Sequence, residues 1–207
     1  MTYDLMNRRS NKTSHHTGVT ASLLAIDSYV EAGVPAEKLN LGFAFYVKWF
    51  KTLPGSEGGC DINPIGCKTV LMEDPDTGAD LGQAGAFSYH DNVPTDLATS
   101  WGKAQKEGEY DDVDGGHYFW DQEESIWWSW DTERAIEMKF PKIVSGTGVG
   151  GVFAWGLGED ADGWGHLKAL SRGYEGWKEG KGGRGGRRCL DDEMLEEFYR
   201  KSVREEL

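Results

Sequence analysis

Long apolar runs are missing from this sequence, and basic residues are scarce in it. No stretch approaches the roughly 18 consecutive apolar residues that a membrane-spanning helix needs, so no membrane association is predicted. Residues 1–12 contain no apolar core of a secretory signal peptide. The chain has 22 lysines and arginines against 35 aspartates and glutamates, and 22 − 35 gives a net charge of −13. This balance argues against nucleic acid and acidic substrates as partners, since both require a cationic surface.

Cysteine is also rare, with three residues among 207. Cys60 and Cys67 enclose a short loop, so the pair forms a disulfide if the protein is exported and stays as two thiols if it is not. The adjacent His15 and His16 point apart on a helix or strand, and no H-E-x-x-H motif is present. We therefore predict neither a metal site nor a cofactor. Asn11 begins an N-glycosylation sequon, which matters only in the secretory pathway.

Three short patterns suggest chemistry but have simpler interpretations. Residues 146–151 (GTGVGG) match G-x-G-x-x-G, yet they follow a predicted helix and precede a strand, the reverse of a dinucleotide-binding motif. Residues 74–80 (DPDTGAD) begin like a calcium loop but lack its later glutamate, which favours a simple turn. The acidic residues of 109–124 are interpreted as a solvated face.

Tryptophan, in contrast, is abundant, with nine residues. We interpret most of them as core residues. A large flat ring beside acidic and amide groups is also the usual way in which a site stacks on a sugar, so this second role stays open.

One helix and one strand are predicted near the start of the chain. Apolar residues recur at spacings of 4, 3 and 4 in Val19, Leu23, Ile26 and Val30. This period predicts a helix within residues 17–33 that has one buried face. Residues 39–46 (LNLGFAFY) then form a nearly continuous apolar run, which predicts a strand buried on both faces.

A second helix and strand are predicted later in the chain. The helix spans residues 132–144, with Asp131 as its N-cap and a kink or an early end at Pro141. Gly151–Trp155 (GVFAW) predicts another buried strand. Alternating helices and strands are typical of a parallel sheet.

The remaining segments follow other patterns. Four short strand-like runs separated by turn residues are found at 68–72, 85–89, 117–120 and 126–130, with a turn at 122–125. They predict a small antiparallel α+β unit inserted between parallel strands. Residues 176–186 contain six glycines and predict a flexible linker, whereas residues 191–207 are typical of a short solvated helix. The expected units are therefore residues 1–47, 48–130, 131–172 and 173–207.

Separated motifs, taken in their order, point to a family. Residues 1–4 (MTYD) precede the first predicted helix, Tyr46 ends the first predicted strand, and residues 150–155 (GGVFAW) follow the insertion. This arrangement, over residues 1 to about 170, resembles glycoside hydrolase family 18, the chitinases, and most of all its fungal members. In that family M-x-Y-D closes the sixth strand of a barrel, the insertion follows the seventh, and a tryptophan ends the eighth. The resemblance implies an α/β fold, a partial TIM (β/α)8 barrel with strands six to eight and an α+β insertion domain.

The resemblance also implies a chemistry and a ligand. The family hydrolyses β-1,4 links between N-acetylglucosamine units by a substrate-assisted retaining route. Tyr3 would bind the acetamido oxygen, Asp4 would contact the same sugar and tune the catalytic acid, and Met1 would line the floor. Trp155 would form the hydrophobic platform under the sugar ring. The partner would be chitin or N-acetylglucosamine oligomers.

Two further positions compare with the strand-seven motif of the family, which often reads Tyr-Gly-Arg. Tyr46 matches its tyrosine, and Lys48 stands at the position of its arginine. An ammonium group is a point charge without the planar fork of a guanidinium, so the ligand specificity can differ here.

The catalytic acid of the family is missing from this sequence. That acid lies in D-x-x-D-x-D-x-E on strand four, and no segment matches it; near Asp111 and Asp114 the pattern fails at Gly116 and Tyr118. The resemblance thus implies the C-terminal part of an extracellular chitinase, inactive alone, with the acid motif encoded upstream. The alternative is a non-catalytic chitin-binding or carbohydrate-binding protein.

Overall fold

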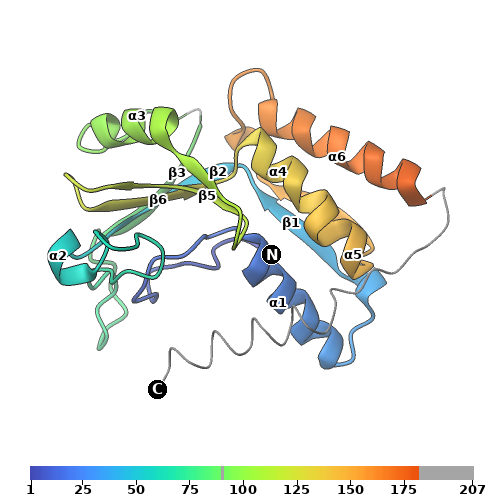
Figure 1. Cartoon of the computed structure of the whole chain (residues 1–207), viewed down its shortest axis with the longest axis horizontal. Coiled ribbons are helices and arrows are strands. Elements are labelled where there is room, and N and C mark those ends of the chain that lie inside the picture. The colour runs from blue at the N-terminus through green and yellow to red at the C-terminus, as the bar shows by residue number, and fades with distance from the viewer. Residues whose placement is uncertain (90, 182–207) are drawn as a thin grey trace.

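The strands form two sheets of different kinds (Figure 1). The computed structural model describes residues 1–89 and 91–181. A parallel pair joins β1 (Asn40–Ala44) to β7 (Gly151–Trp155), and a five-stranded antiparallel sheet has the order β3-β2-β6-β5-β4. The strands of this second sheet are β2 (Tyr46–Lys51), β3 (Ala84–Ser88), β4 (Glu109–Asp111), β5 (Gly116–Asp121) and β6 (Ile126–Trp130). No closed barrel is formed by the described residues, and none of their helices is long and apolar enough to cross a bilayer.

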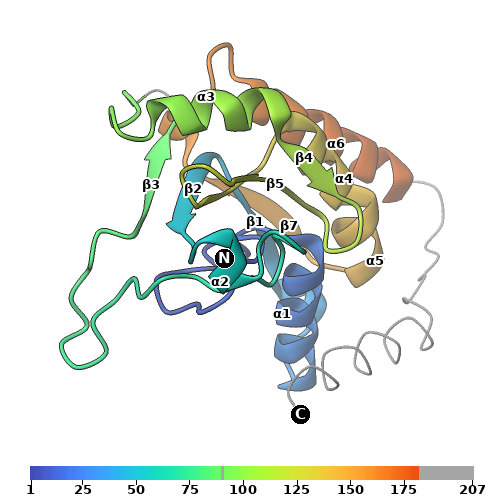
Figure 2. The ribbon, with the colours of Figure 1, turned by 60° about the vertical axis from the view of Figure 1, so that its left-hand side comes forward.

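Helices cover both sheets. The longer ones are α1 (Val19–Glu31), α3 (Ala98–Glu107), α4 (Glu133–Lys139) and α6 (Gly165–Lys181). Short turns of helix are η1 (Ala36–Lys38), α2 (Gly55–Gly58), η2 (Phe140–Val144), α5 (Ser145–Thr147) and η3 (Leu157–Glu159). Figure 1 shows α4 and α6 side by side along the parallel pair, and Figure 2 shows α3 across the antiparallel sheet. Each sheet therefore buries its apolar side chains against helices of its own.

The first predicted helix and strand are present with changed bounds. The helix is α1, which buries Val19 and Ile26 but leaves Val30 exposed. The single strand predicted over residues 39–46 is instead two strands, β1 and β2, separated by Phe45. The backbone N–H of Phe45 donates to the carbonyl of Trp155 at 2.8 Å. The chain thus passes directly from the parallel pair into the antiparallel sheet.

The predicted cap of the second helix was wrong. Thr132, not Asp131, is the N-cap of α4, because its hydroxyl oxygen accepts from the N–H of Ala135 at 3.2 Å. Asp131 is buried and its carboxylate accepts from Lys139 Nζ at 2.5 Å. Regular α-helix ends at Lys139 and continues as the π-helical turn η2, which contains Pro141. Of the two predicted effects of this proline, a kink or an early end, the second is confirmed for the regular α-helix, which ends before Pro141.

The strand predicted over residues 68–72 is absent. Lys68 forms a single bridge with Lys12, and Thr69 forms one with Thr52. Because the segment contacts a different partner at each residue, no continuous ladder forms. The other three predicted runs are β3, β5 and β6, whereas β4 and α3 were not placed by the sequence.

The acidic stretch is not a solvated face throughout. Asp121 is buried, and its carboxylate accepts from the backbone N–H groups of Glu123 and Glu124 at 3.1 and 3.2 Å. Asp111 lies 2.9 Å from Nε2 of His15. Both acids therefore hold turns or segments together, a role that a composition count does not reveal.

Two predicted loops take compact forms. Cys60 and Cys67 form a disulfide, and the N–H of Cys67 donates to the hydroxyl of Thr13 at 3.1 Å, which ties the loop to the N-terminal segment. The carboxylate of Asp74 accepts from the N–H groups of Asp76 and Thr77 at 3.0 and 2.7 Å. Residues 74–80 are therefore a turn held by hydrogen bonds within itself.

The glycine-rich segment begins as a helix, which corrects the predicted linker. Helix α6 continues through Gly176 to Lys181 because Ala169 and Trp177 lie on one buried face. Burial of that face overrides the low helix propensity of glycine. The rest of the predicted linker and the helix expected over residues 191–207 lie outside the described residues.

Asp160 fixes the start of α6 and gives a pH-dependent prediction. Its buried carboxylate accepts from the N–H groups of His166 and Leu167 at 3.0 and 2.9 Å, and lies 2.6 Å from Nδ1 of His166. Burial raises the pKa of Asp160, but these hydrogen bonds outweigh it and lower the pKa. A depressed pKa stabilises the fold above the unfolded value of about 3.9, and this contribution is lost as the pH falls below it.

We therefore expect Asp160→Ala to lower the free energy of unfolding at pH 7 by about 2–3 kcal/mol. The difference from the wild type should shrink as the pH falls from about 4 to 2, as measured by urea unfolding at each pH. The exposed Asp76→Ala variant is the control. A difference that stays constant with pH would contradict this role.

Candidate functional site

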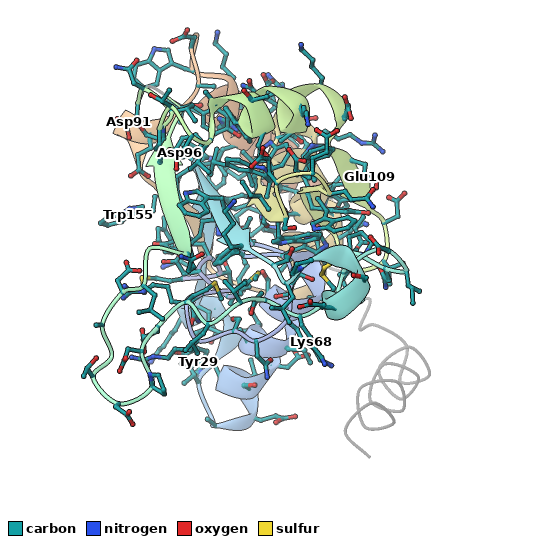
Figure 3. The ribbon with its side chains drawn as sticks, turned by 90° about the vertical axis from the view of Figure 1, so that its left-hand side faces the viewer. Tyr29, Lys68, Asp91, Asp96, Glu109 and Trp155 are labelled. Atoms are coloured by element: carbon teal, nitrogen blue, oxygen red, sulfur yellow. A yellow bond between two sulfur atoms is a disulfide. The ribbon has the colours of Figure 1, made fainter. Side chains whose placement is uncertain are left out.

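The pairing of β1 with β7 brings two predicted site residues together. In the parallel register Ala44 is opposite Trp155, and Tyr46 follows two residues after Ala44. The indole of Trp155 is 59 % exposed, at an edge of the molecule that Asp91 also occupies (Figure 3). Both strands end here, and the carboxyl ends of parallel strands are where α/β sheets bind ligands.

Residues 2–4 lie against β1 through Thr2. The Thr2 hydroxyl donates to the carbonyl of Gly42 at 2.6 Å and accepts from the N–H of Gly42 at 3.0 Å. A Cβ added at Gly42 would lie 2.9 Å from the ring of Tyr3 and 2.8 Å from that of Phe153. The glycine therefore leaves the space in which these two rings pack, and so positions Tyr3 next to the parallel pair.

Asp4 connects the N-terminal segment to β2. Its carboxylate accepts from the hydroxyl of Tyr46 and from Nζ of Lys48, both at 2.8 Å. Its φ of 58° is in the left-handed region, which is uncommon for residues other than glycine and is often found at functional sites. Three of the predicted site residues thus form one hydrogen-bonded group.

The site has two tyrosine hydroxyls, that of Tyr46 within this group and that of Tyr3, whose ring lies next to the ring of Tyr46. Tyr3 is only 8 % exposed, and its hydroxyl has no hydrogen-bond partner among the described residues. Burial, followed by the charges of Asp4 and Glu159, raises the pKa of Tyr3. Burial and the hydrogen bond to Asp4 raise the pKa of Tyr46. Both hydroxyls are therefore protonated at neutral pH and can donate hydrogen bonds.

A buried histidine lies behind Tyr46. The ring of His16 is fully buried, its centroid lies 5.3 Å from that of Tyr46, and neither ring nitrogen has a partner among the residues described. Burial lowers the pKa of His16 well below its usual value, and the cations Lys48 and Lys139 lower it further. A neutral ring thus supports Tyr46 from the core. Within residues 1–89 and 91–181, no group of three or more His, Cys, Asp or Glu side chains could hold a metal ion.

Two predicted residues lie outside the hydrogen-bonded group. Met1 is 83 % exposed and has no part in the contacts around Asp4. Asn11 is exposed, and its backbone carbonyl accepts from the N–H of Thr69 at 3.1 Å. The roles assigned to these two residues stay predictions.

Glu159, in η3, was missed by sequence reasoning. Its Oε2 atom is buried without a hydrogen-bond partner in the described structure, and a Cβ added at Gly156 would lie 3.6 Å from it. Burial raises the pKa of Glu159, a hydrogen bond from the Gly156 backbone opposes this, and the charges of Asp91 and Asp4 add to the rise. The only sequence signal was a carboxylate four residues after Trp155.

A cavity of about 400 Å³ lies elsewhere, where α3, β5 and β6 meet the starts of α4 and α6. Its lining includes Tyr89, Trp101, His117 and Trp130. None of the predicted site residues contributes to it. The strand end that carries the exposed Trp155, together with the hydrogen-bonded group around Asp4, is therefore the candidate site.

The comparison with known families agrees with this geometry. The model of Glycosyl hydrolases family 18 matches residues 1–160. The chain belongs to glycosyl hydrolase family 18. The match includes every residue of the site from Tyr3 to Glu159, so the family predicted from the sequence is confirmed. No curated protein matches the chain.

Solved structures of chitinases and of a chitinase-like agglutinin resemble the fold. The chitinase RmChi1 from Rhizomucor miehei has a TM-score of 0.61 and 22 % identity, covering 84 % of this chain and 52 % of its own. A mutant of the plant class V chitinase from Cycas revoluta in complex with (GlcNAc)3 has a TM-score of 0.55 and 23 % identity, covering 83 % and 44 %. The chitinase-like agglutinin from Robinia pseudoacacia has a TM-score of 0.56 and 22 % identity, covering 84 % and 46 %. The chain thus has an α/β fold like these proteins and spans about half of their length.

Proposed function

We propose that this family 18 chain binds β-1,4-linked N-acetylglucosamine oligomers at the site beside Trp155 and does not hydrolyse them by itself. The observation that carries this proposal is the exposed indole of Trp155, at the strand end that also positions the Tyr3 hydroxyl and the Asp4 group. Aromatic faces and convergent polar groups are what a pyranose ring requires, because one face of the ring is apolar and its rim is polar.

The proposed contacts follow from the donors and acceptors present. The Tyr3 hydroxyl, which has no partner among the described groups, donates to the acetamido oxygen of the sugar. Asp4 keeps its bonds to Tyr46 and Lys48 and accepts from the same sugar at a free lone pair. The Cycas revoluta protein in complex with (GlcNAc)3 supports this ligand class.

The fold correspondence is part of the same proposal. We infer that residues 1–4, β1 and β7 correspond to strands six, seven and eight of a (β/α)8 barrel, and that the antiparallel sheet is the inserted α+β unit. The parallel pairing of β1 with β7 and the half-length coverage of the solved chains support this correspondence.

The absent acid motif supports the lack of hydrolysis. A substrate-assisted route needs a proton donor at the leaving oxygen, and the sequence has no D-x-x-D-x-D-x-E segment. Asp4 does not replace it, since its carboxylate already accepts hydrogen bonds from Tyr46 and Lys48. Without a donor, bound sugar is held but not cleaved.

A second candidate is a non-catalytic carbohydrate-binding protein, which the resemblance to the Robinia pseudoacacia agglutinin favours. The two candidates differ in whether bound sugar is hydrolysed once the chain is part of a complete barrel. A hybrid in which it replaces the matching part of the Rhizomucor miehei chitinase separates them. Hydrolysis by a folded hybrid supports the chitinase role, and binding without hydrolysis supports the second candidate.

We expect saturable binding of (GlcNAc)4 to the whole chain, measured by tryptophan fluorescence, together with no release of reducing ends above a protein-free control. Absence of a saturable signal would contradict binding. Turnover above the control would contradict the proposed lack of hydrolysis.

A further inference from the structure

We propose that Glu159 contacts the bound sugar directly, accepting a hydrogen bond from an N–H or O–H group of the ligand. This role rests on the proposed function, because it assigns one more contact to the same site. It gives the site a second carboxylate acceptor in addition to Asp4. The charges of both carboxylates act on the Tyr3 hydroxyl.

The first support is an unpaired acceptor. Oε2 of Glu159 is buried and has no hydrogen-bond partner among residues 1–89 and 91–181, although a buried carboxylate oxygen without a donor is costly. The hydroxyl of Tyr3 is also buried and has no hydrogen-bond partner among the described residues. One unpaired acceptor and one unpaired donor in the same site match a ligand that offers both, as an acetamido group does with its N–H and its carbonyl.

The second support is position. Oε2 lies beside Gly156, the residue that directly follows the platform residue Trp155. The charge of Glu159 also acts on the hydroxyls of both Tyr3 and Tyr46, so its carboxylate belongs to the same group as the predicted sugar contacts.

The surroundings of Glu159 define the ligand class. The charges of Asp4, in the N-terminal segment, and of Asp91, after β3, raise the pKa of Glu159. The charge of Glu159 in turn raises the pKa of Tyr3 and of Tyr46 in β2. With three carboxylates, two neutral hydroxyls and the cation Lys48, which pairs with Asp4, this side of the site favours neutral sugars that donate hydrogen bonds. Oligosaccharides that carry uronic acids are disfavoured by repulsion.

The test uses the whole chain, (GlcNAc)4 and calorimetric titration between pH 7 and pH 5. Glu159→Gln keeps the size of the side chain but removes its charge, and we expect it to bind about tenfold more weakly at pH 7. Wild-type affinity should fall as the pH falls, because burial and the neighbouring acids raise the pKa of Glu159 and its protonation removes the acceptor charge. The decline should be much smaller in Glu159→Gln, because an amide at this position does not change its charge with pH.

Glu107→Gln, an exposed glutamate at the end of α3, is the matched control and should bind like the wild type at each pH. Thermal unfolding confirms that each variant is folded. Equal affinity and an equal pH profile in Glu159→Gln and the wild type would overturn this role and leave the proposed function standing. A wild-type chain that binds no (GlcNAc)4 at any pH would overturn both.

Discussion

Trp155→Ala is expected to weaken the binding of N-acetylglucosamine oligomers about 10- to 30-fold. An indole face that covers about 60–80 Å² of the apolar face of a sugar contributes about 1.5–2 kcal/mol, which corresponds to this loss of affinity. Because Trp155 is 59 % exposed, its removal should leave the free energy of unfolding nearly unchanged. Calorimetric titration with (GlcNAc)4 measures the change without depending on tryptophan fluorescence.

Two other aromatic residues serve as controls for this prediction. Tyr29 on α1 is also 59 % exposed but lies far from Trp155 (Figure 3), so Tyr29→Ala should retain wild-type affinity. Trp127 is fully buried, and its indole N–H donates to the carbonyl of Ser14 at 2.9 Å. Trp127→Ala should therefore cost about 3–5 kcal/mol of stability while its folded fraction still binds. Equal losses of affinity in Trp155→Ala and Trp127→Ala would argue against the platform.

The second large effect is expected at the buried ion pair of Lys139 and Asp131. Lys139 Nζ donates to Asp131 at 2.5 Å and to the hydroxyl of Thr17 at 2.7 Å, and all three residues are buried. Burial raises the pKa of Asp131 and lowers that of Lys139, whereas their mutual attraction favours the charged forms. Each charge is thus stable in the core only while the other is present.

Lys139→Met should lower the free energy of unfolding by about 3–5 kcal/mol, because it leaves the Asp131 carboxylate buried and unpaired. Urea unfolding at pH 7 provides the measurement. The double variant Asp131→Asn with Lys139→Met should recover most of the loss, since no uncompensated charge is then buried. Lys168→Met, at an exposed position of α6, is the surface control. The explanation fails if Lys139→Met is as stable as that control.

Much of the local structure could be predicted because it depends on short-range patterns. The helical spacing of Val19 and Ile26 and the apolar run of Gly151–Trp155 require only that apolar residues share a face. The order of the motifs from Tyr3 to Trp155 also indicated the family, since motif order is a property of the chain itself. Local patterns could not place Asp131, whose carboxylate pairs across the core instead of capping the helix that follows it.

The sequence by itself determined the family, both parallel strands and the residues Tyr3, Asp4, Tyr46, Lys48 and Trp155 as a candidate set. Only the tertiary structure decided that Asp4 bonds to Tyr46 and Lys48, and that Trp155 stands at the same strand end. It also decided that Oε2 of Glu159 is buried without a hydrogen-bond partner among the described residues. The physical reason is that burial, partner distance and the pKa of a carboxylate depend on which distant segments surround it, and a one-dimensional pattern contains no information about those neighbours.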